Sequence, residues 1–248
     1  MSLTNTSVKI LKGDVKKVLS DLAKNNEHVS RYTAIITSPP YYGRRNYGDD
    51  ENEIGGEHSD QKYLDKLTEV FKLCKQFLTR DGSLWIVIGD SKKAGIKLNI
   101  PHRLAFSLER EGYQLRDDIV WFKRNHMSGS AKSSLTSAYE YILFFSMNQK
   151  CKVDNILKSS RKKGYSNFWD IPTLAHHGQP HYAMYPETLV ERIISIATYP
   201  DDAVLDPFAG RGTTGIVCAE NGRRFLGIDL YEYRSSNPKR TLFELSEA

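Results

Sequence analysis

Cysteine is scarce in this chain of 248 residues, and its three copies, Cys74, Cys151 and Cys218, lie far apart. They form no Cys-x-x-Cys pair, and the histidines lack acidic partners at the spacing of metal ligands, so we expect no metal site. An odd number of widely separated cysteines also argues against a disulfide framework. We therefore expect the protein in the cytoplasm.

Long apolar runs are missing as well. No run approaches the ~18 residues that a helix needs to cross a bilayer, and the N-terminus has no charged-then-apolar leader, so we expect no membrane partner. What is present is the composition of a globular protein, with 40% hydrophobic and 11% aromatic residues. A net charge of +5 favours an acidic partner such as nucleic acid.

Apolar runs of strand length alternate with helical patterns along the chain. This predicts an α/β fold with a doubly wound, mostly parallel, Rossmann-like sheet of seven strands. The runs assigned to strands are 8–11, 34–37, 84–88, 118–122, 141–145, 203–206 and 224–229. Helical patterns start after Asp14, cover 63–78 and 101–112, and start again at Pro186. One sheet of this size fits a single domain over residues 1–248.

The segment Ser38-Pro39-Pro40-Tyr41 closes the second of these strands and is the most informative one in the chain. Two consecutive prolines fix φ and remove two backbone donors, so the corner offers carbonyl acceptors in a fixed direction. Ser38 adds a side-chain acceptor, and Tyr41 adds a flat ring on which a base can stack. Such a corner suits holding the exocyclic amine of a base while it accepts a methyl group. The plain alternative is a proline-rich turn.

A second motif runs from Asp206 to Gly215 and predicts a strand end, a glycine turn and a helix start. Gly210 and Gly212 let the backbone approach a ligand closely, and the helix that follows directs free N–H groups toward it. Another strand ends at Asp229, about 20 residues later, where acids in nucleotide-binding sheets take ribose hydroxyls. A helix cap is the plain alternative for Asp229. The spacing differs from the Gly-x-Gly-x-x-Gly fingerprint but leaves NAD binding open.

Together these motifs resemble the amino-group DNA methyltransferases that use S-adenosylmethionine, and the resemblance covers most of the chain. The segment 206–214 is similar to that family's cofactor loop, with Arg211 where serine is usual. The segment 37–41 is similar to its catalytic motif. Here the catalytic motif precedes the cofactor loop, which is the order of the family's β group.

The resemblance implies a site, residue by residue. The expected catalytic residues are Ser38, Pro39, Pro40 and Tyr41. The residues expected to bind S-adenosylmethionine are Asp14, Tyr182, Tyr185, Pro186, Asp206, Pro207, Phe208, Ala209, Gly210, Gly212, Thr213, Thr214 and Asp229. For Asp14, an N-cap of the first helix is an equal and compatible role. In a doubly wound sheet the strands that end at Thr37 and Asp206 would be neighbours at the ligand-binding edge.

Two polar stretches do not fit the core pattern and are expected to contact DNA. Residues 123–138 predict a mobile active-site loop, and residues 150–180 predict a target-recognition insert with basic and aromatic residues interleaved. The predicted DNA-binding residues are Arg44, Arg45, Lys123, Arg124, Lys158, Arg161, Lys162 and Lys163. The plain alternative for the basic run is a solvated surface turn.

A base inside a duplex cannot present its amine to the corner, so we expect the target nucleotide to be flipped out and stacked on Tyr41. Within the resemblance, Ser-Pro-Pro-Tyr is typical of cytosine N4 methylation, whereas adenine N6 enzymes mostly carry Asp or Asn before the prolines. None of the cysteines follows a proline, which excludes enzymes that methylate a ring carbon of cytosine. We therefore predict a DNA (cytosine-N4-specific) methyltransferase, with adenine N6 as the alternative.

Other interpretations stay open. A nicotinamide-dependent oxidoreductase uses the same kind of sheet, and a catalytically silent DNA-binding subunit or an RNA substrate are weaker alternatives. The expected partner is double-stranded DNA, in a prokaryotic, DNA-associated setting. The resemblance to restriction–modification enzymes allows a cognate restriction endonuclease. Because the insert is short, we expect either a short recognition site or a homodimer.

Overall fold

The computed structural model describes residues 7–26, 28–43, 53–126, 135–160, 165–173, 185–231 and, for the backbone alone, 244–247. Six predicted site residues lie outside these ranges, namely Arg44, Arg45, Arg161, Lys162, Lys163 and Tyr182. Most of the predicted active-site loop, 127–134, lies outside them too, as do 161–164 and 174–180 of the predicted insert.

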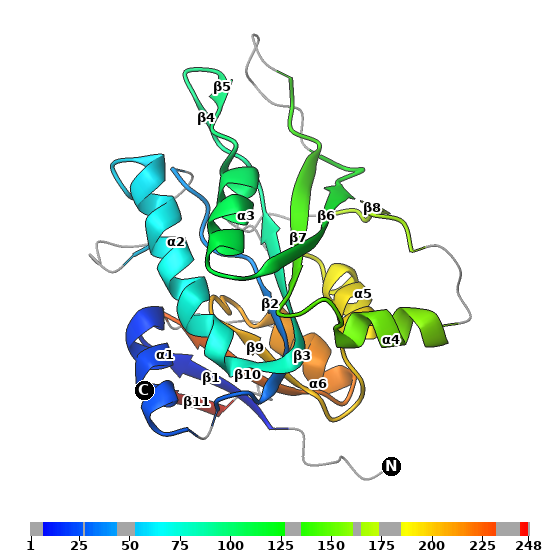
Figure 1. The fold of residues 1–248 in the computed structure, drawn as a ribbon. Coiled ribbons are helices and arrows are strands. Elements are labelled where there is room, and N and C mark those ends of the chain that lie inside the picture. The colour runs from blue at the N-terminus through cyan, green and yellow to red at the C-terminus, as the bar shows by residue number, and fades with distance from the viewer. Residues whose placement is uncertain are drawn as a thin grey trace.

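Within the described residues, one sheet of nine strands organises the molecule (Figure 1), in the order β11-β1-β10-β9-β2-β3-β7-β6-β8. Strand β7 runs antiparallel to both β3 and β6, and the other neighbours are parallel. The strands are β1 Val8–Lys12, β2 Tyr32–Thr37, β3 Leu78–Ile88, β6 Gln114–Phe122, β7 Tyr139–Ser146, β8 Phe168–Asp170, β9 Ala203–Asp206, β10 Arg224–Asp229 and β11 Glu244–Glu247.

Two layers of helices cover the two faces of this sheet. Helices α1 to α3 pack one apolar cluster, through residues such as Leu19 and Leu67, and α4 to α6 pack the other, through residues such as Ile193 and Val217. The helices are α1 Val15–Lys24, α2 Asp60–Cys74, α3 Ile100–Arg110, α4 Lys152–Ser159, α5 Glu187–Ala197 and α6 Thr213–Glu220. This is a doubly wound α/β sheet, and the predicted fold class is confirmed.

The seven predicted strands are all present, and the short strands β8 and β11 extend the sheet at its two edges. Two predicted boundaries are wrong. The strand expected over 84–88 begins earlier, because β3 runs from Leu78 through Asp81 and Gly82, with an irregular register against β2. The helix expected over 63–78 ends at Cys74 and passes through a short 3-10 turn.

The expectation that segment 150–180 lies outside the core is wrong for its described part. Val153 and Ile156 of α4 are buried, and Trp169 of β8 is buried with 1% exposed surface. β8 pairs with β6, so this part of the segment belongs to the sheet and its cover. Lys158 of this part is exposed, while its apolar residues do the packing.

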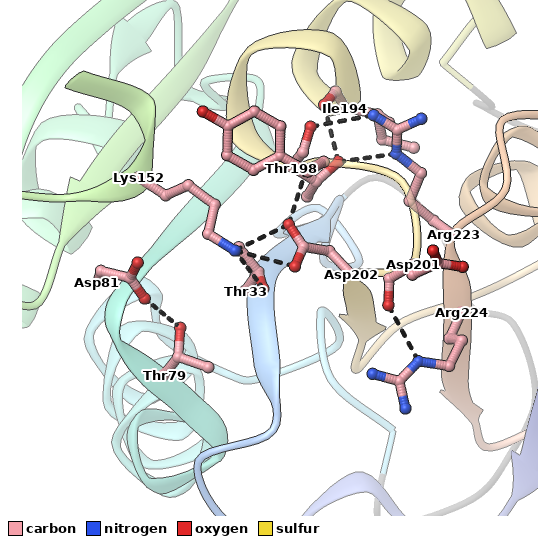
Figure 2. A network of polar contacts seen from close by, with 11 residues as sticks. Thr33, Thr79, Asp81, Lys152, Ile194, Thr198, Asp201, Asp202, Arg223 and Arg224 are labelled. Atoms are coloured by element: carbon pink, nitrogen blue, oxygen red, sulfur yellow. Dashed lines mark hydrogen bonds and ion pairs between the residues drawn. The ribbon is translucent and has the colours of Figure 1, made fainter. Parts of the chain in front are cut away.

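The first turn of α4 is fixed at the amino ends of the strands, the edge away from the catalytic segment (Figure 2). The Lys152 ammonium lies 2.9 Å from both carboxylate oxygens of Asp202, just before β9, and 3.4 Å from the hydroxyl of Thr33 in β2. Asp202 also accepts the Tyr199 backbone N–H at 2.7 Å. This partly buried pair therefore joins three elements that are remote in sequence.

In the part of the chain that the structure describes, no helix combines the length and the apolar character that crossing a membrane requires.

Candidate active site

The predicted catalytic corner and the predicted cofactor loop lie side by side at one edge of the sheet. β2 pairs with β9 in parallel, with Ile35 opposite Leu205, so both chains leave the sheet together after Thr37 and Asp206. β10 pairs with β9 on its other side, and β1 pairs with β10. The four carboxyl ends thus meet where the sheet's strand order reverses, which confirms the expected neighbourhood of the two motifs.

The catalytic corner is held from outside by α2 and by the segment before it. The Tyr63 hydroxyl, on a fully buried side chain of α2, donates to the Pro40 carbonyl oxygen at 2.8 Å. Gly43 N–H donates to the Gly55 carbonyl oxygen at 2.8 Å. Gly55 has φ of +112°, and a Cβ there would lie 3.2 Å from the Tyr41 carbonyl oxygen. The corner is therefore rigid on both sides, and the Pro40 carbonyl already has a donor.

Tyr41 is fixed by a carboxylate. Its hydroxyl donates to Glu140 Oε2 at 2.8 Å, and Lys123 forms an ion pair with the other oxygen of Glu140. Glu140 is 8% exposed, so this charge is compensated inside the protein. Gly89, just after β3, lets the ring lie close, because a Cβ there would be 3.0 Å from Tyr41 Cε2. The ring that is predicted to stack on a base thus has a defined orientation.

Two of the three described cations of the predicted DNA-binding set, Lys123 and Arg124, have protein partners. Lys123 pairs with Glu140 and lies over the Trp121 ring, 4.7 Å from its centroid. Arg124, which is exposed, binds both carboxylate oxygens of Asp170, with its Nη2 2.7 Å from Oδ2. Contact with phosphate by these two stays a prediction, and for Lys123 it competes with a partly buried ion pair.

Lys158 is exposed on α4. The first turn of that helix is fixed at the amino edge of the sheet, opposite the corner (Figure 1). A contact between Lys158 and DNA also stays a prediction.

The glycine loop after β9 has the backbone that its sequence predicts. Gly210 and Gly212 have φ of +52° and +80°, in the left-handed region that favours glycine, and Gly212 is the N-cap of α6. Ala209 N–H donates to the Ile228 carbonyl oxygen at 2.9 Å, which ties the loop to β10. Gly227 makes this approach possible, because a Cβ there would lie 2.7 Å from that of Ala209.

Asp206 organises the start of the loop from a fully buried position. Its carboxylate accepts from the Thr214 hydroxyl at 2.7 Å, the Phe208 N–H at 3.1 Å and the Tyr185 hydroxyl at 3.2 Å. Burial raises the pKa of Asp206 to about 6, although hydrogen bonds from Thr37 and Thr214 lower it. Burial also raises the pKa of Tyr185, so this side chain remains a hydroxyl donor. Tyr185, Asp206 and Thr214 thus form one network.

The other predicted cofactor residues flank this network. Pro186 is the N-cap of α5 and is buried, and Phe208 packs edge-on against Phe71. Pro207 is buried at the exit of β9, and Thr213 begins α6.

The two acids at the far side of the loop are close to each other. Asp229 Oδ2 accepts the Gly210 N–H at 2.7 Å, and Oδ1 accepts the Tyr231 N–H at 3.0 Å. Asp14 caps α1 by accepting the Lys17 N–H at 2.9 Å, which confirms its predicted capping role. Gly13 N–H donates to the Asp229 carbonyl oxygen at 2.8 Å, so the two acids follow paired strand ends. A carboxylate has about four lone-pair sites, which leaves capacity for ligand hydroxyls.

Sequence reasoning missed three contributors to this edge. Glu140 lies in an apolar strand and Tyr63 lies on the buried face of an amphipathic helix, where nothing local marks them as partners of the corner. The third is a small hairpin, β4 Lys92–Lys93 and β5 Ile96–Lys97, where Gly95 between short lysine-containing segments is the only local turn signal. Beside it lies a pocket of about 520 Å³, lined by Tyr42, Gly55 and the hairpin lysines, among others.

Asp90, an acid without an assigned role in the sequence, holds the base of this hairpin. Its Oδ1 accepts the Ser91 N–H at 2.9 Å and the Ile100 N–H at 3.0 Å.

Comparison with known proteins decides the family. A family model described as DNA methylase, of the N6/N4 type, matches residues 32–237. The chain belongs to the N6/N4 family of DNA methylases. The matched span includes both the catalytic corner and the glycine loop. Membership of this family argues against the alternative of a nicotinamide-dependent oxidoreductase.

Individual relatives of this N6/N4 methylase cover nearly its whole length. It is 34% identical to the type II methyltransferase M.Cfr9I of Citrobacter freundii, over 89% of this chain and 83% of the relative. It is 31% identical to M.SmaI of Serratia marcescens, over 95% of this chain and 91% of the relative. The chain is thus a type II DNA methyltransferase of the N6/N4 family.

Solved structures agree with this fold. A putative DNA modification methylase from Thermus thermophilus, complexed with S-adenosyl-L-methionine, superposes with a TM-score of 0.71 at 25% identity, over 96% of this chain and 99% of that chain. PvuII DNA methyltransferase, which is cytosine-N4-specific, gives a TM-score of 0.72 at 21% identity, over 96% of this chain and 90% of that chain. The second likeness concerns the fold alone.

Proposed function

We propose that this DNA methyltransferase moves a methyl group from S-adenosylmethionine to the exocyclic N4 amine of a flipped cytosine in duplex DNA. The observation that carries the proposal is the parallel pairing of β2 with β9, which sets the Ser38–Tyr41 corner beside the glycine loop. An amine acceptor on one loop and a methyl donor on the other then face each other at one sheet edge. Serine before the two prolines supports cytosine as the base.

S-adenosylmethionine is the cofactor, and the described residues fit it. The left-handed glycines Gly210 and Gly212 keep the loop free of side chains where a ligand approaches. Asp229, at the end of β10, offers carboxylate lone pairs for ribose hydroxyls. When bound, the cofactor supplies an electrophilic methyl group on a sulfonium.

The corner would position and activate the amine. The Ser38 hydroxyl and the Pro39 carbonyl accept its two N–H groups, which draws the nitrogen lone pair out of the ring and aims it at the methyl group. Tyr41, held by Glu140, supports the flipped base by stacking. An amine that accepts a methyl group must lose one proton, and the Ser38 hydroxyl would pass that proton to water.

Incubation of the pure protein with labelled S-adenosylmethionine and mixed-sequence duplex DNA, digestion to nucleosides and mass spectrometry tests the proposal. We expect N4-methylcytosine from the wild type, and cofactor binding without transfer from Ser38→Ala. N6-methyladenine instead would overturn the choice of base while leaving the arrangement of the site intact. No methylated nucleoside from a protein that binds the cofactor would overturn DNA as the substrate.

A further inference from the structure

A short lysine-rich hairpin stands out from the molecule beside the catalytic corner. We call residues 91–98 the lysine hairpin; it pairs β4 with β5, Lys92 opposite Lys97 and Lys93 opposite Ile96. Ala94 and Gly95 form its turn, with φ of +51° and +80°. Figure 1 shows it projecting beyond the helices and the sheet. A two-residue turn of this kind makes a compact, regular ribbon.

The base of the hairpin is bonded to the chain that leaves the catalytic corner. The Ser91 hydroxyl donates to the Tyr42 carbonyl oxygen at 2.8 Å, one residue after Tyr41. Leu98 N–H donates to the Ser91 carbonyl oxygen at 2.9 Å, and Asp90 caps both this base and the start of α3. Whatever binds the hairpin is therefore held at a fixed place relative to the corner.

Within the described chain, no ion pair with a carboxylate neutralises the hairpin lysines. Lys92 donates to the Leu135 carbonyl oxygen at 3.2 Å and Lys97 to the Tyr139 hydroxyl at 3.2 Å, both neutral partners. By contrast, a paired carboxylate lies beside each of Lys16, Lys66, Lys72, Lys123 and Lys152. Lys93 acts on the Asp60 carboxylate only at longer range, and that carboxylate is already paired with Arg103. Three exposed lysines within six residues, none with an ion-paired carboxylate of its own, favour an anionic ligand.

The tip adds an apolar group. Ile96 is 72% exposed, which is unusual for a large aliphatic side chain. Some DNA-binding elements contact phosphates through cations on their sides and contact bases or sugars through an apolar tip. The lysine hairpin has this composition. A membrane surface or an acidic peptide explains the charge but not the rigid link to the corner.

We propose that the lysine hairpin is a DNA-holding arm. Lys92, Lys93 and Lys97 contact backbone phosphates of the duplex next to the target nucleotide, and Ile96 lies against the groove. The pocket of about 520 Å³ between the hairpin and the Tyr42–Gly43 chain receives the strand. This inference rests on the proposed function, because it takes the bound nucleic acid to be the one whose base enters the corner.

Replacing the three hairpin lysines by glutamine tests the arm. The matched control is Lys16→Gln, Lys17→Gln and Lys24→Gln on α1, which removes the same charge at the far end of the molecule (Figure 1). Affinity for a labelled mixed-sequence duplex is measured at several salt concentrations. For the hairpin variant we expect the slope of log affinity against log salt to fall by about 0.9 for each phosphate that is no longer neutralised, and affinity near 0.1 M salt to fall roughly tenfold or more.

S-adenosylmethionine affinity should match the wild type in both triple variants. The midpoint of thermal unfolding should match the wild type in the hairpin variant and fall only slightly in the control, which breaks the exposed ion pairs of Lys16, Lys17 and Lys24. Ile96→Ser is a second variant, expected to leave the salt slope unchanged and to weaken binding by a factor that salt does not alter. Equal slopes for hairpin variant, control and wild type would overturn the inference.

Methyl transfer, measured in parallel, separates the two proposals. If the wild type methylates DNA but the hairpin variant keeps the wild-type salt slope, the proposed function stands and the DNA-holding arm is overturned. If the hairpin variant loses DNA affinity but the wild type methylates no DNA, the arm stands and the proposed function is overturned.

Discussion

At the scale of single residues, the site depends on side chains that hold other side chains. Tyr41 is the residue expected to touch the base, and Glu140 fixes it through a bond of 2.8 Å from the tyrosine hydroxyl. Glu140 is in turn fixed by Lys123. A positioning residue of this kind changes turnover without touching the reacting atoms, because small displacements of a stacked base reduce alignment.

We expect Tyr41→Phe and Glu140→Ala each to lower the rate constant of methyl transfer to DNA roughly tenfold, since either change lets the ring move. S-adenosylmethionine affinity should be unchanged. The double variant should lose no more than the stronger single variant, because both remove the same link. The measurement is single-turnover methyl transfer in all four proteins. Fully additive losses would contradict the link.

Asp206 gives a prediction in pH. Its pKa of about 6 in the folded protein lies above the ~3.9 of an exposed aspartate, so the folded state binds the proton more tightly than the unfolded one. Between these values stability therefore falls as pH rises, by about 3 kcal/mol in all for this group. Above pH 6 the buried charge lowers the free energy of unfolding by this full amount, and below pH 4 it has no effect.

Asp206→Asn isolates that contribution. We expect the free energy of unfolding of the wild type, relative to Asp206→Asn, to decrease from pH 4 to pH 6 and then to level off. Urea titrations across this range measure it. A difference that does not vary with pH would show that folding leaves the pKa of Asp206 unchanged, and one that grows as pH rises would show that the carboxylate ionises more readily in the folded protein.

At the scale of elements, the close packing of β10 against the glycine loop limits which residues fit. A Cβ on Gly227 would lie 2.7 Å from Ala209 Cβ and 2.9 Å from the Phe225 ring. Gly227→Ala should therefore push the loop away, lower the free energy of unfolding by about 1–3 kcal/mol and weaken S-adenosylmethionine binding.

Gly56→Ala is a suitable comparison for stability, because nothing lies within 4 Å of the added carbon. Thermal unfolding and cofactor titration of both variants check the expectation. A Gly227→Ala protein with wild-type cofactor affinity would mean that the loop tolerates displacement.

Elements with a strong apolar signal could be predicted from the sequence, and so could the residues at their ends. The strands before Ser38 and Pro207 are buried runs, and the proline and glycine residues that follow specify the turns, so both halves of the site are predictable and lie together. β8 has three residues, and the lysine hairpin is exposed, so neither has a buried periodic pattern to detect. The Glu140 contact joins residues 99 positions apart, which no local rule can supply.

At the scale of the whole molecule, the described part of the predicted recognition insert is small and partly committed to packing. We therefore expect the enzyme to read a short site or to act on DNA as two copies. Gel filtration with light scattering, with and without DNA, measures the state directly. A strict monomer that reads a long site would contradict this expectation.

The strand order also bears on how the molecule is made. β9 and β10 are translated near the end of the described chain, yet they lie in the middle of the sheet, between β1 and β2. Until residue 229 has left the ribosome, β1 and β2 have open edges and the corner at Ser38 has no cofactor loop beside it. Growing chains should therefore be late to fold and inactive until β9 and β10 have emerged, and fragments ending before β9 should tend to aggregate.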